Sequence, residues 1–144
     1  EDDFDAAGNV VYGGLAHHMI RMYPRALYVI VDLPETLFFS GTYLSLIHGS
    51  DRILLARRMS DLRPDRLKKK SFVLVPNFGL SWLSGLRFDL ALNILSFQEM
   101  SARQVETYLS FLQSRVSAIL SWNADKNFFR SSSFVFLFIR LGFF

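Results

Sequence analysis

The chain has 144 residues, a length that corresponds to one domain. Hydrophobic residues make up 51% and charged residues 20%, a balance that excludes a disordered chain, and the net charge of +3 is small. The chain has no cysteine, so disulfides, thiolate metal sites and a thiol nucleophile are excluded.

The first half of the chain predicts a helix, a strand and a second helix. A helix is expected at 14–22, directly after a cluster of glycines. Residues 26–31 form an apolar run without polar alternation, which is typical of a strand buried on both faces. The next helix, 34–47, begins with Pro34 and Glu35, two residues that are favourable in a first turn.

The segment 50–70 is polar and basic, and we interpret it as a surface helix or connection. A solvated surface is the expected state of such a charge run, with a nucleic-acid or anionic-membrane patch as the alternative. Aromatic residues do not alternate with these charges, so the segment lacks the rings on which the bases of a single-stranded nucleic acid would stack.

The second half of the chain again alternates predicted strands with a predicted helix. Strands are expected at 71–75, before Pro76, and at 88–93. A helix is expected at 101–113, with Ser101 as its N-cap. The run 116–122 is a strand or the end of that helix. The apolar residues 134–144 include Arg140 and are too few to span a bilayer; they form a last strand or a segment foreign to the fold.

Strands that alternate with helices predict an α/β fold. We expect a Rossmann-like, doubly wound, mostly parallel sheet that is truncated at both ends. The acidic start, with Glu1, Asp2 and Asp3, does not fit a signal peptide, and together with the lack of cysteine it favours a cytoplasmic protein without a membrane span.

Two features near the start suggest a nucleotide site. Gly8, Gly13 and Gly14 precede a helix, where glycines allow a close approach of backbone N–H groups to a ligand. Asp32 follows the first strand, eighteen positions after Gly14, and an acidic residue about 20 residues after a glycine turn can bind ribose hydroxyls. The alternative role of Asp32 is to cap the helix that starts at Pro34.

Asn93 lies at the end of another predicted strand. Ligands of open α/β sheets bind beyond the carboxyl ends of the strands, so Asn93 is expected to face that crevice. The alternative is an ordinary polar loop residue that serves as a cap.

Several blocks in order resemble the sugar O-methyltransferases that use S-adenosylmethionine and have a class I methyltransferase fold. The blocks are Tyr12-Gly13-Gly14-Leu15-Ala16, Asp32-Leu33-Pro34-Glu35, Tyr43-Leu44, Phe88-Asp89-Leu90 with Asn93, Ser96-Phe97-Gln98-Glu99-Met100, Tyr108 and Asn123. The acidic residue that usually precedes the family's glycine turn is replaced by the run Phe4-Asp5-Ala6-Ala7-Gly8.

The resemblance implies a partial methyltransferase domain at 1–127, followed by an apolar tail at 128–144. It implies that Gly8, Gly13 and Gly14, with Tyr12 in the same block, hold the methionine end of S-adenosylmethionine. Asp32 would hold the ribose, and Leu33 would lie near the adenine. Asn93 and Glu99 would border the side of a sugar or glycan substrate.

A general base would help a sugar hydroxyl to attack the methyl group. The candidates are His17, His18 and Glu99, although His17 and His18 are adjacent on a helix and only one can face the site. Surface or packed histidines are the alternative. The spacing of histidines and carboxylates suggests no metal site. The chain as a whole is also compatible with an inactive remnant of such a domain, with a nicotinamide-dependent enzyme and, least of all, with a basic binding module.

Overall fold

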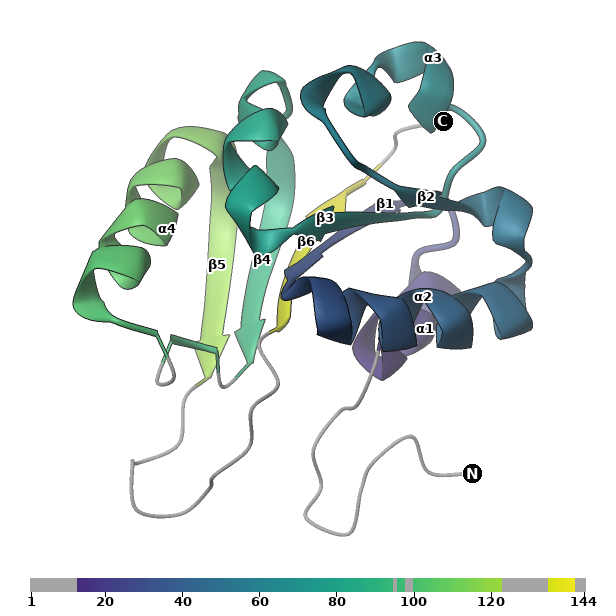
Figure 1. Ribbon diagram of the computed structural model, residues 1–144, viewed down its shortest axis with the longest axis horizontal. Coiled ribbons are helices and arrows are strands. Elements are labelled where there is room, and N and C mark those ends of the chain that lie inside the picture. Colours follow the sequence, from purple (N-terminus) through teal and green to yellow (C-terminus); the bar gives the residue numbers. More distant parts are fainter. Residues whose placement is uncertain (1–12, 95, 98–99, 123–134, 142–144) are drawn as a thin grey trace, which may run out of the picture.

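The structure is a computed structural model that describes residues 13–94, 96–97, 100–122 and 135–141. These residues form an α/β fold in which one six-stranded mixed sheet lies between two helical layers (Figure 1). The strands are β1 (Leu27–Asp32), β2 (Ile53–Leu55), β3 (Phe72–Pro76), β4 (Phe88–Ile94), β5 (Val116–Trp122) and β6 (Val135–Arg140). The helices are α1 (Gly14–Met22), α2 (Pro34–His48), α3 (Pro64–Leu67) and α4 (Ala102–Arg115), with 3₁₀ segments η1 (Ser50–Arg52), η2 (Met59–Leu62) and η3 (Asn77–Gly85).

The strand order is β2-β3-β1-β6-β4-β5. Neighbouring strands are parallel except at β6, which is antiparallel to both β1 and β4. The carboxyl ends of β1, β3 and β4 therefore lie at the same edge of the sheet. The prediction of an α/β fold with a mostly parallel sheet is confirmed.

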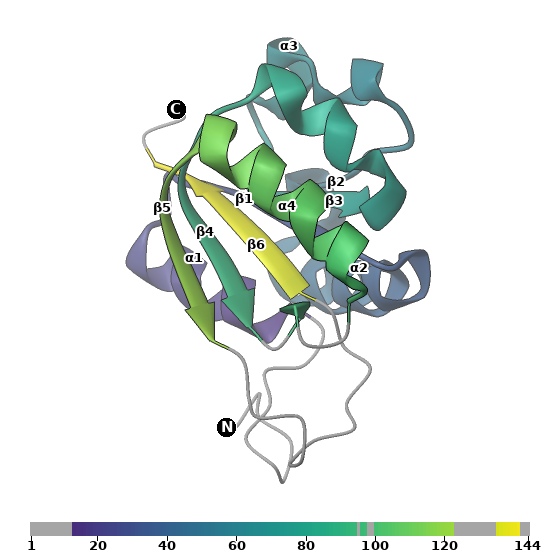
Figure 2. The same ribbon diagram turned by 90° about the vertical axis from the view of Figure 1, so that its left-hand side faces the viewer.

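Side chains that alternate along β1 pack into two separate cores. Leu27, Val29 and Val31 face the side covered by α4, α3 and the 3₁₀ segments, whereas Tyr28 and Ile30 face α1 and α2. Figure 2 shows α4 in front of the sheet. A strand that is covered on both faces needs apolar residues throughout, which explains the unbroken apolar run in the sequence.

The expected helices and buried strands are confirmed with shifts of one or two residues at their ends. Ser101 caps α4 as expected: its hydroxyl accepts a hydrogen bond from the Gln104 N–H, and the Gln104 side chain accepts one from the Ser101 N–H, which is a capping box. The run 116–122 is strand β5 rather than the end of α4. The segment 50–70 contains strand β2, which was not expected from the sequence.

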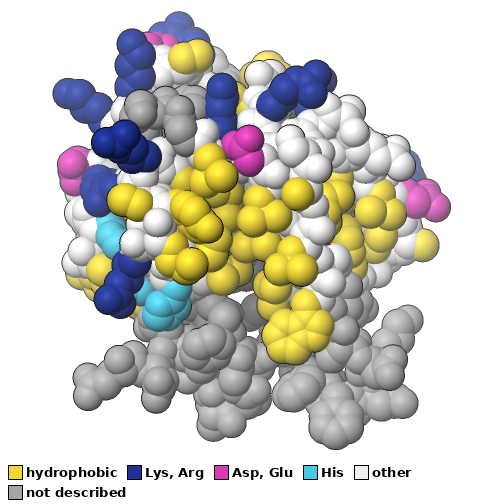
Figure 3. All heavy atoms as spheres, turned by 180° about the vertical axis from the view of Figure 1, so that it is seen from behind, with side chains coloured by type: hydrophobic (Ala, Val, Ile, Leu, Met, Phe, Trp, Pro, Cys, Tyr) yellow, Lys and Arg dark blue, Asp and Glu magenta, His cyan; other side chains and the backbone are white. Residues whose placement is uncertain are grey.

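The α1 side of the sheet is only partly covered. Leu120 and Trp122 of β5 are 58% and 62% exposed, and the register places them beside Leu92 and Ile94 of β4. Seen from behind, hydrophobic side chains form a band across the middle of the molecule (Figure 3). No described helix is both long enough and apolar enough to cross a membrane.

Residues 135–140 of the apolar tail form β6, so part of the tail is a strand of the sheet. Leu137, Phe138 and Ile139 are buried, and the Phe138 ring lies 5.0 Å from the ring of Phe88 and 5.7 Å from that of Phe111. Because β6 is the strand that pairs with both β1 and β4, it joins the two halves of the sheet.

We expect Phe138→Ala to lower the free energy of unfolding by about 3–5 kcal/mol, since it leaves a cavity between both halves of the sheet. Urea unfolding followed by circular dichroism measures this loss. Leu141→Ala is the control, because Leu141 is 49% exposed and its truncation is expected to cost less than about 1 kcal/mol. Equal, small losses in the two variants would contradict a central position of β6.

Candidate functional site

Asp32 is the last residue of β1 and is almost completely buried, with 1% of its surface exposed. Its Oδ1 atom accepts a hydrogen bond from the Leu33 N–H at 2.7 Å. Its Oδ2 atom is buried and has no hydrogen-bond partner in the described part of the chain. The N-cap of α2 is Leu33, and α2 has no side-chain cap, so Asp32 does not serve as the N-cap of that helix.

Burial raises the pKa of Asp32 to about 7, and the hydrogen bond from Leu33 lowers it only partly. A carboxylate without water or a cation nearby is costly, so the neutral form is favoured until a donor reaches it. Strongly shifted carboxyl groups that face a cavity are candidates for functional sites. Asp32 combines a raised pKa with an acceptor atom that lacks a partner among the described residues.

Asp32 faces a small cavity of about 50 Å³ at the carboxyl edge of the sheet. The cavity is lined by residues from β1, the start of η3, the approach to α4 and α4 itself: Val31, Asp32, Leu33, Asn77, Met100, Gln104 and Tyr108. Gln104 and Tyr108 are four residues apart on α4 and so share one face of that helix. Burial, and secondarily the charge of Asp32, raise the pKa of Tyr108 to about 12, so its phenol stays protonated.

A wider hollow of about 500 Å³ shares Asn77, Gln104 and Tyr108 with the cavity of Asp32. It lies between η3 and α4, and its remaining lining includes the aromatic side chains Phe78 and Phe111. Amide and phenol groups therefore border one end of an apolar hollow, next to the cavity that Asp32 lines. This combination suits a ligand with a hydroxyl-rich part and a flat apolar part.

Asn93 lies at the same edge of the sheet as Asp32. Phe136 in β6 pairs with Val31 of β1 on one side and with Asn93 of β4 on the other. The ends of β1 and β4 are therefore two strand spacings apart, which is about 10 Å. Asn93 is fully buried, and its amide donates to Ser121 Oγ at 2.7 Å and accepts from the Ser96 N–H at 3.2 Å. These bonds join β4 to β5 and to the following loop, which gives Asn93 a structural role.

Gly13 is the N-cap of α1 and has a φ of 90°, a conformation that favours glycine. A Cβ atom at Gly13 would lie 3.2 Å from Leu44 Cδ1 and 3.6 Å from Ser40 Cβ. Ser40 is six residues after Pro34, about 9 Å along α2. Gly13 and Gly14 therefore start a helix that packs on the middle of α2, and neither lines the cavity of Asp32.

His17 and His18 are placed away from Asp32. The His17 Nδ1 atom lies 3.0 Å from His48 Nε2, and His48 is the last residue of α2. Because Asp32 immediately precedes α2, about 20 Å of helix separates the two ends. His18 is exposed. Burial, the neighbouring His17 and then Arg52 lower the pKa of His48, so His48 is held as a neutral imidazole that connects α2 to α1.

Gly8, Tyr12 and Glu99, the other predicted site residues, lie outside the described residues. Leu33 lines the cavity beside Asp32, and its role as a neighbour of adenine stays a prediction. Asn77, Gln104 and Phe111 were not predicted from the sequence. Asn77 could have been found, because it follows Pro76, the residue that stops a predicted strand at the same edge as Asp32. Gln104 could not, because its role depends on how α4 packs.

A scan of protein-family models, a search of curated proteins and a search of solved structures return no match to this chain. The geometry of the cavity is therefore the basis for a functional interpretation.

The buried carboxyl group predicts an unusual pH dependence of stability. The pKa of Asp32 is about 7 in the folded chain and 3.8 as the unperturbed value, so the folded state binds more protons between these pH values. Stability that Asp32 contributes at low pH is therefore lost as the pH rises to about 7. Asp32→Asn, which has the same shape and no charge, should stabilise the protein at pH 8 by up to about 4 kcal/mol and have little effect at pH 3.5.

Thermal or urea unfolding at several pH values measures this difference. Asp65→Asn is the matched control, because Asp65 is exposed and pairs with Arg63 at the surface. If Asp32→Asn were as neutral as Asp65→Asn at pH 8, Asp32 would not be buried without a partner.

Proposed function

We propose that this chain binds the nucleoside part of S-adenosylmethionine at Asp32 and acts as an O-methyltransferase on the hydroxyl group of a sugar or glycan precursor. The observation that carries the proposal is the buried Oδ2 atom of Asp32, which has no partner in the described residues and faces a cavity. A ribose diol supplies two hydroxyl donors, and a carboxylate can accept both.

The position of Asp32 supports the same interpretation. In doubly wound Rossmann-like folds, the nucleoside lies beyond the carboxyl ends of the strands, and an acidic residue at the end of one strand holds the ribose. Asp32 ends β1, and Asn77 follows the neighbouring parallel strand β3. The hollow beside them, with Phe78 and Phe111, offers a place for the adenine ring.

When bound, S-adenosylmethionine would supply the methyl group for direct displacement by the acceptor oxygen, with S-adenosylhomocysteine as the leaving group and release of the hydroxyl proton. The chain then has to position the sulfonium carbon in line with the hydroxyl group and to exclude water. Asp32 would fix the ribose and Leu33 would pack beside the adenine. The hydrogen bonds of Asn93 with Ser121 and with Ser96 would hold the strand ends on the substrate side.

A nucleoside-binding domain without catalytic activity is the second candidate. The placement of His17 against His48, at the far end of α2, favours it, since that histidine has no access to a methyl group near Asp32. Incubation with S-adenosylmethionine and a mixture of nucleotide sugars distinguishes the two. Formation of S-adenosylhomocysteine supports the enzyme, and binding without turnover supports the second candidate.

We expect the chain to bind S-adenosylhomocysteine and Asp32→Ala to weaken this binding by about 1.5–3 kcal/mol, which is the cost of losing a hydrogen bond to a charged group. Isothermal titration calorimetry measures both affinities. Asp65→Asn is the control and should bind like the original chain. Absence of heat with the original chain would exclude the proposal, and binding of a nicotinamide dinucleotide in its place would indicate a different enzyme class.

The affinity should also depend on pH. Hydroxyl donors favour the charged form of Asp32, whose pKa is about 7 in the free site. Affinity should therefore fall as the pH drops below 7, by up to about tenfold per pH unit. Asp32→Asn should remove this dependence, as measured by calorimetry between pH 5.5 and about 8.5. A pH-independent affinity in the original chain would show that the ligand does not contact Asp32.

A further inference from the structure

A larger cavity of about 830 Å³ lies beside the edge strand β2, and Asp32 is not among the described residues that line it. Its walls come from α2, β2, the end of β3 and η3. Cavities that bind small molecules have volumes of roughly 300–1,000 Å³, so this one is large enough for an organic ligand. We name it the β2 groove.

The β2 groove is built mostly of apolar side chains. Leu37 and Leu74 form its buried part, while Phe38, Leu46 and Phe78 are 70%, 83% and 69% exposed at its border. Gly41 lets α2 pack closely on β3 at the floor of the groove, because a Cβ atom there would lie 2.9 Å from Leu74 Cδ1. Large exposed apolar side chains around one hollow mark a binding surface rather than ordinary exposure.

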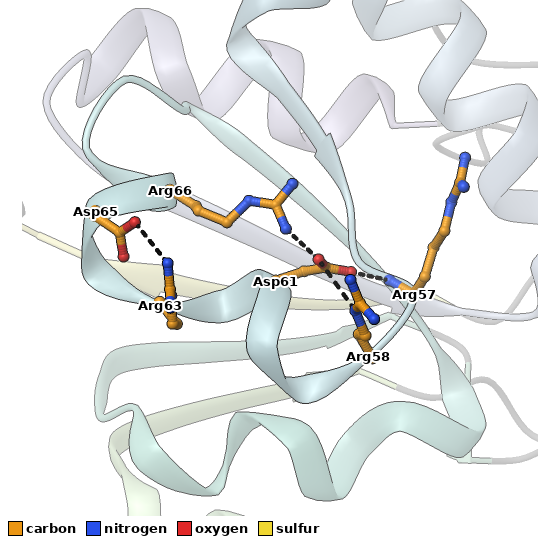
Figure 4. A network of polar contacts seen from close by, with 6 residues as sticks. All are labelled: Arg57, Arg58, Asp61, Arg63, Asp65 and Arg66. Carbon is orange, nitrogen blue, oxygen red and sulfur yellow. Dashed lines mark hydrogen bonds and ion pairs between the residues drawn. The ribbon is translucent and has the colours of Figure 1, made fainter.

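The single charged residue among the described residues that line the groove is Arg57. Arg57 belongs to the basic segment, where Asp61 is the centre of a polar cluster. Asp61 accepts from the backbone N–H of Arg57 at 2.9 Å and pairs with the side chains of Arg58 and Arg66. Figure 4 shows that the Arg57 side chain extends away from this cluster.

The charges around the groove therefore favour an anion. Within the described part of the chain no carboxylate lines the groove, and the carboxylate of Asp61 is already bound by Arg58 and Arg66. The hydroxyl groups of Thr42, Ser45 and Ser50 add polar atoms to the lining. An apolar hollow that carries one guanidinium group suits a molecule with a long apolar part and a single negative group.

We propose that the β2 groove binds a long-chain carboxylate, with the alkyl chain against Leu37, Leu74 and Phe38 and the carboxylate at Arg57. Phe78 borders both this groove and the wider hollow next to the cavity of Asp32, but Asp32 does not line the groove, and the proposal does not depend on the function proposed for Asp32. The occupant is a free fatty acid, because an acyl ester lacks the carboxylate that Arg57 would bind; a lauroyl ester should therefore bind more weakly than laurate.

Calorimetric titration of the full chain with octanoate, decanoate and laurate tests the proposal. Each buried methylene should tighten binding by up to about fourfold, so laurate should bind best, at one molecule per chain. Arg57→Gln should weaken laurate about fivefold and leave dodecanol unchanged, because the alcohol carries no charge. Arg63→Gln is the matched control, since Arg63 is an exposed arginine that does not line the groove.

Thr42→Phe places a large ring at an exposed position in the groove and should reduce binding of both laurate and dodecanol without changing the melting temperature. Absence of laurate binding would overturn the proposal. So would equal losses in Arg57→Gln and Arg63→Gln, which would indicate unspecific attraction, or full binding by Thr42→Phe, which would place the ligand elsewhere. Asp32→Ala should leave laurate binding unchanged, so the two sites are tested separately.

Discussion

The burial of one carboxyl group, that of Asp32, is the constraint on which the functional interpretation depends. β1 needs apolar residues because both of its faces are covered, yet it ends in a carboxyl group that is 1% exposed. One oxygen is satisfied by the Leu33 N–H, and the other has no partner among the described residues. A buried acceptor without a partner costs free energy, and the proposed ligand would offset this cost by donating a hydrogen bond to Asp32.

The rest of the fold brings suitable groups to that carboxyl. Parallel pairing of β1 with β3 places Asn77 at the same edge of the sheet. The capping box at Ser101 fixes where α4 begins, and the helical period then directs Gln104 and Tyr108 toward Asp32. β6 supports this arrangement from the centre of the sheet, because it pairs with β1 on one side and β4 on the other.

Much of this architecture follows from local sequence patterns. The apolar runs at β1, β3 and β4 identify buried strands, and Pro34 and Ser101 mark the starts of α2 and α4. The strand β2 was not predicted because its three residues, in a polar and basic segment, are too few to show a periodic pattern. The central position of β6 depends on pairing over more than a hundred residues with β1, which no local pattern encodes.

The candidate site was predicted in part. Asp32 and Leu33 are found where the sequence placed them, at the end of a strand and beside a cavity. Gly13 and His17 instead pack along α2, because α1 crosses that helix near Ser40 and reaches His48. How two helices pack depends on their complete surfaces, so the spacing of glycines or histidines in the sequence could not reveal it.

Titration of the Asp32 carboxyl carbon by nuclear magnetic resonance, with and without S-adenosylhomocysteine, tests the central claim most directly. The structure predicts a pKa of about 7 for the free protein and a lower pKa when the ligand's hydroxyl groups bind the carboxylate. A pKa near the ordinary 3.8 in the free protein, or a value that the ligand leaves unchanged, would contradict the account.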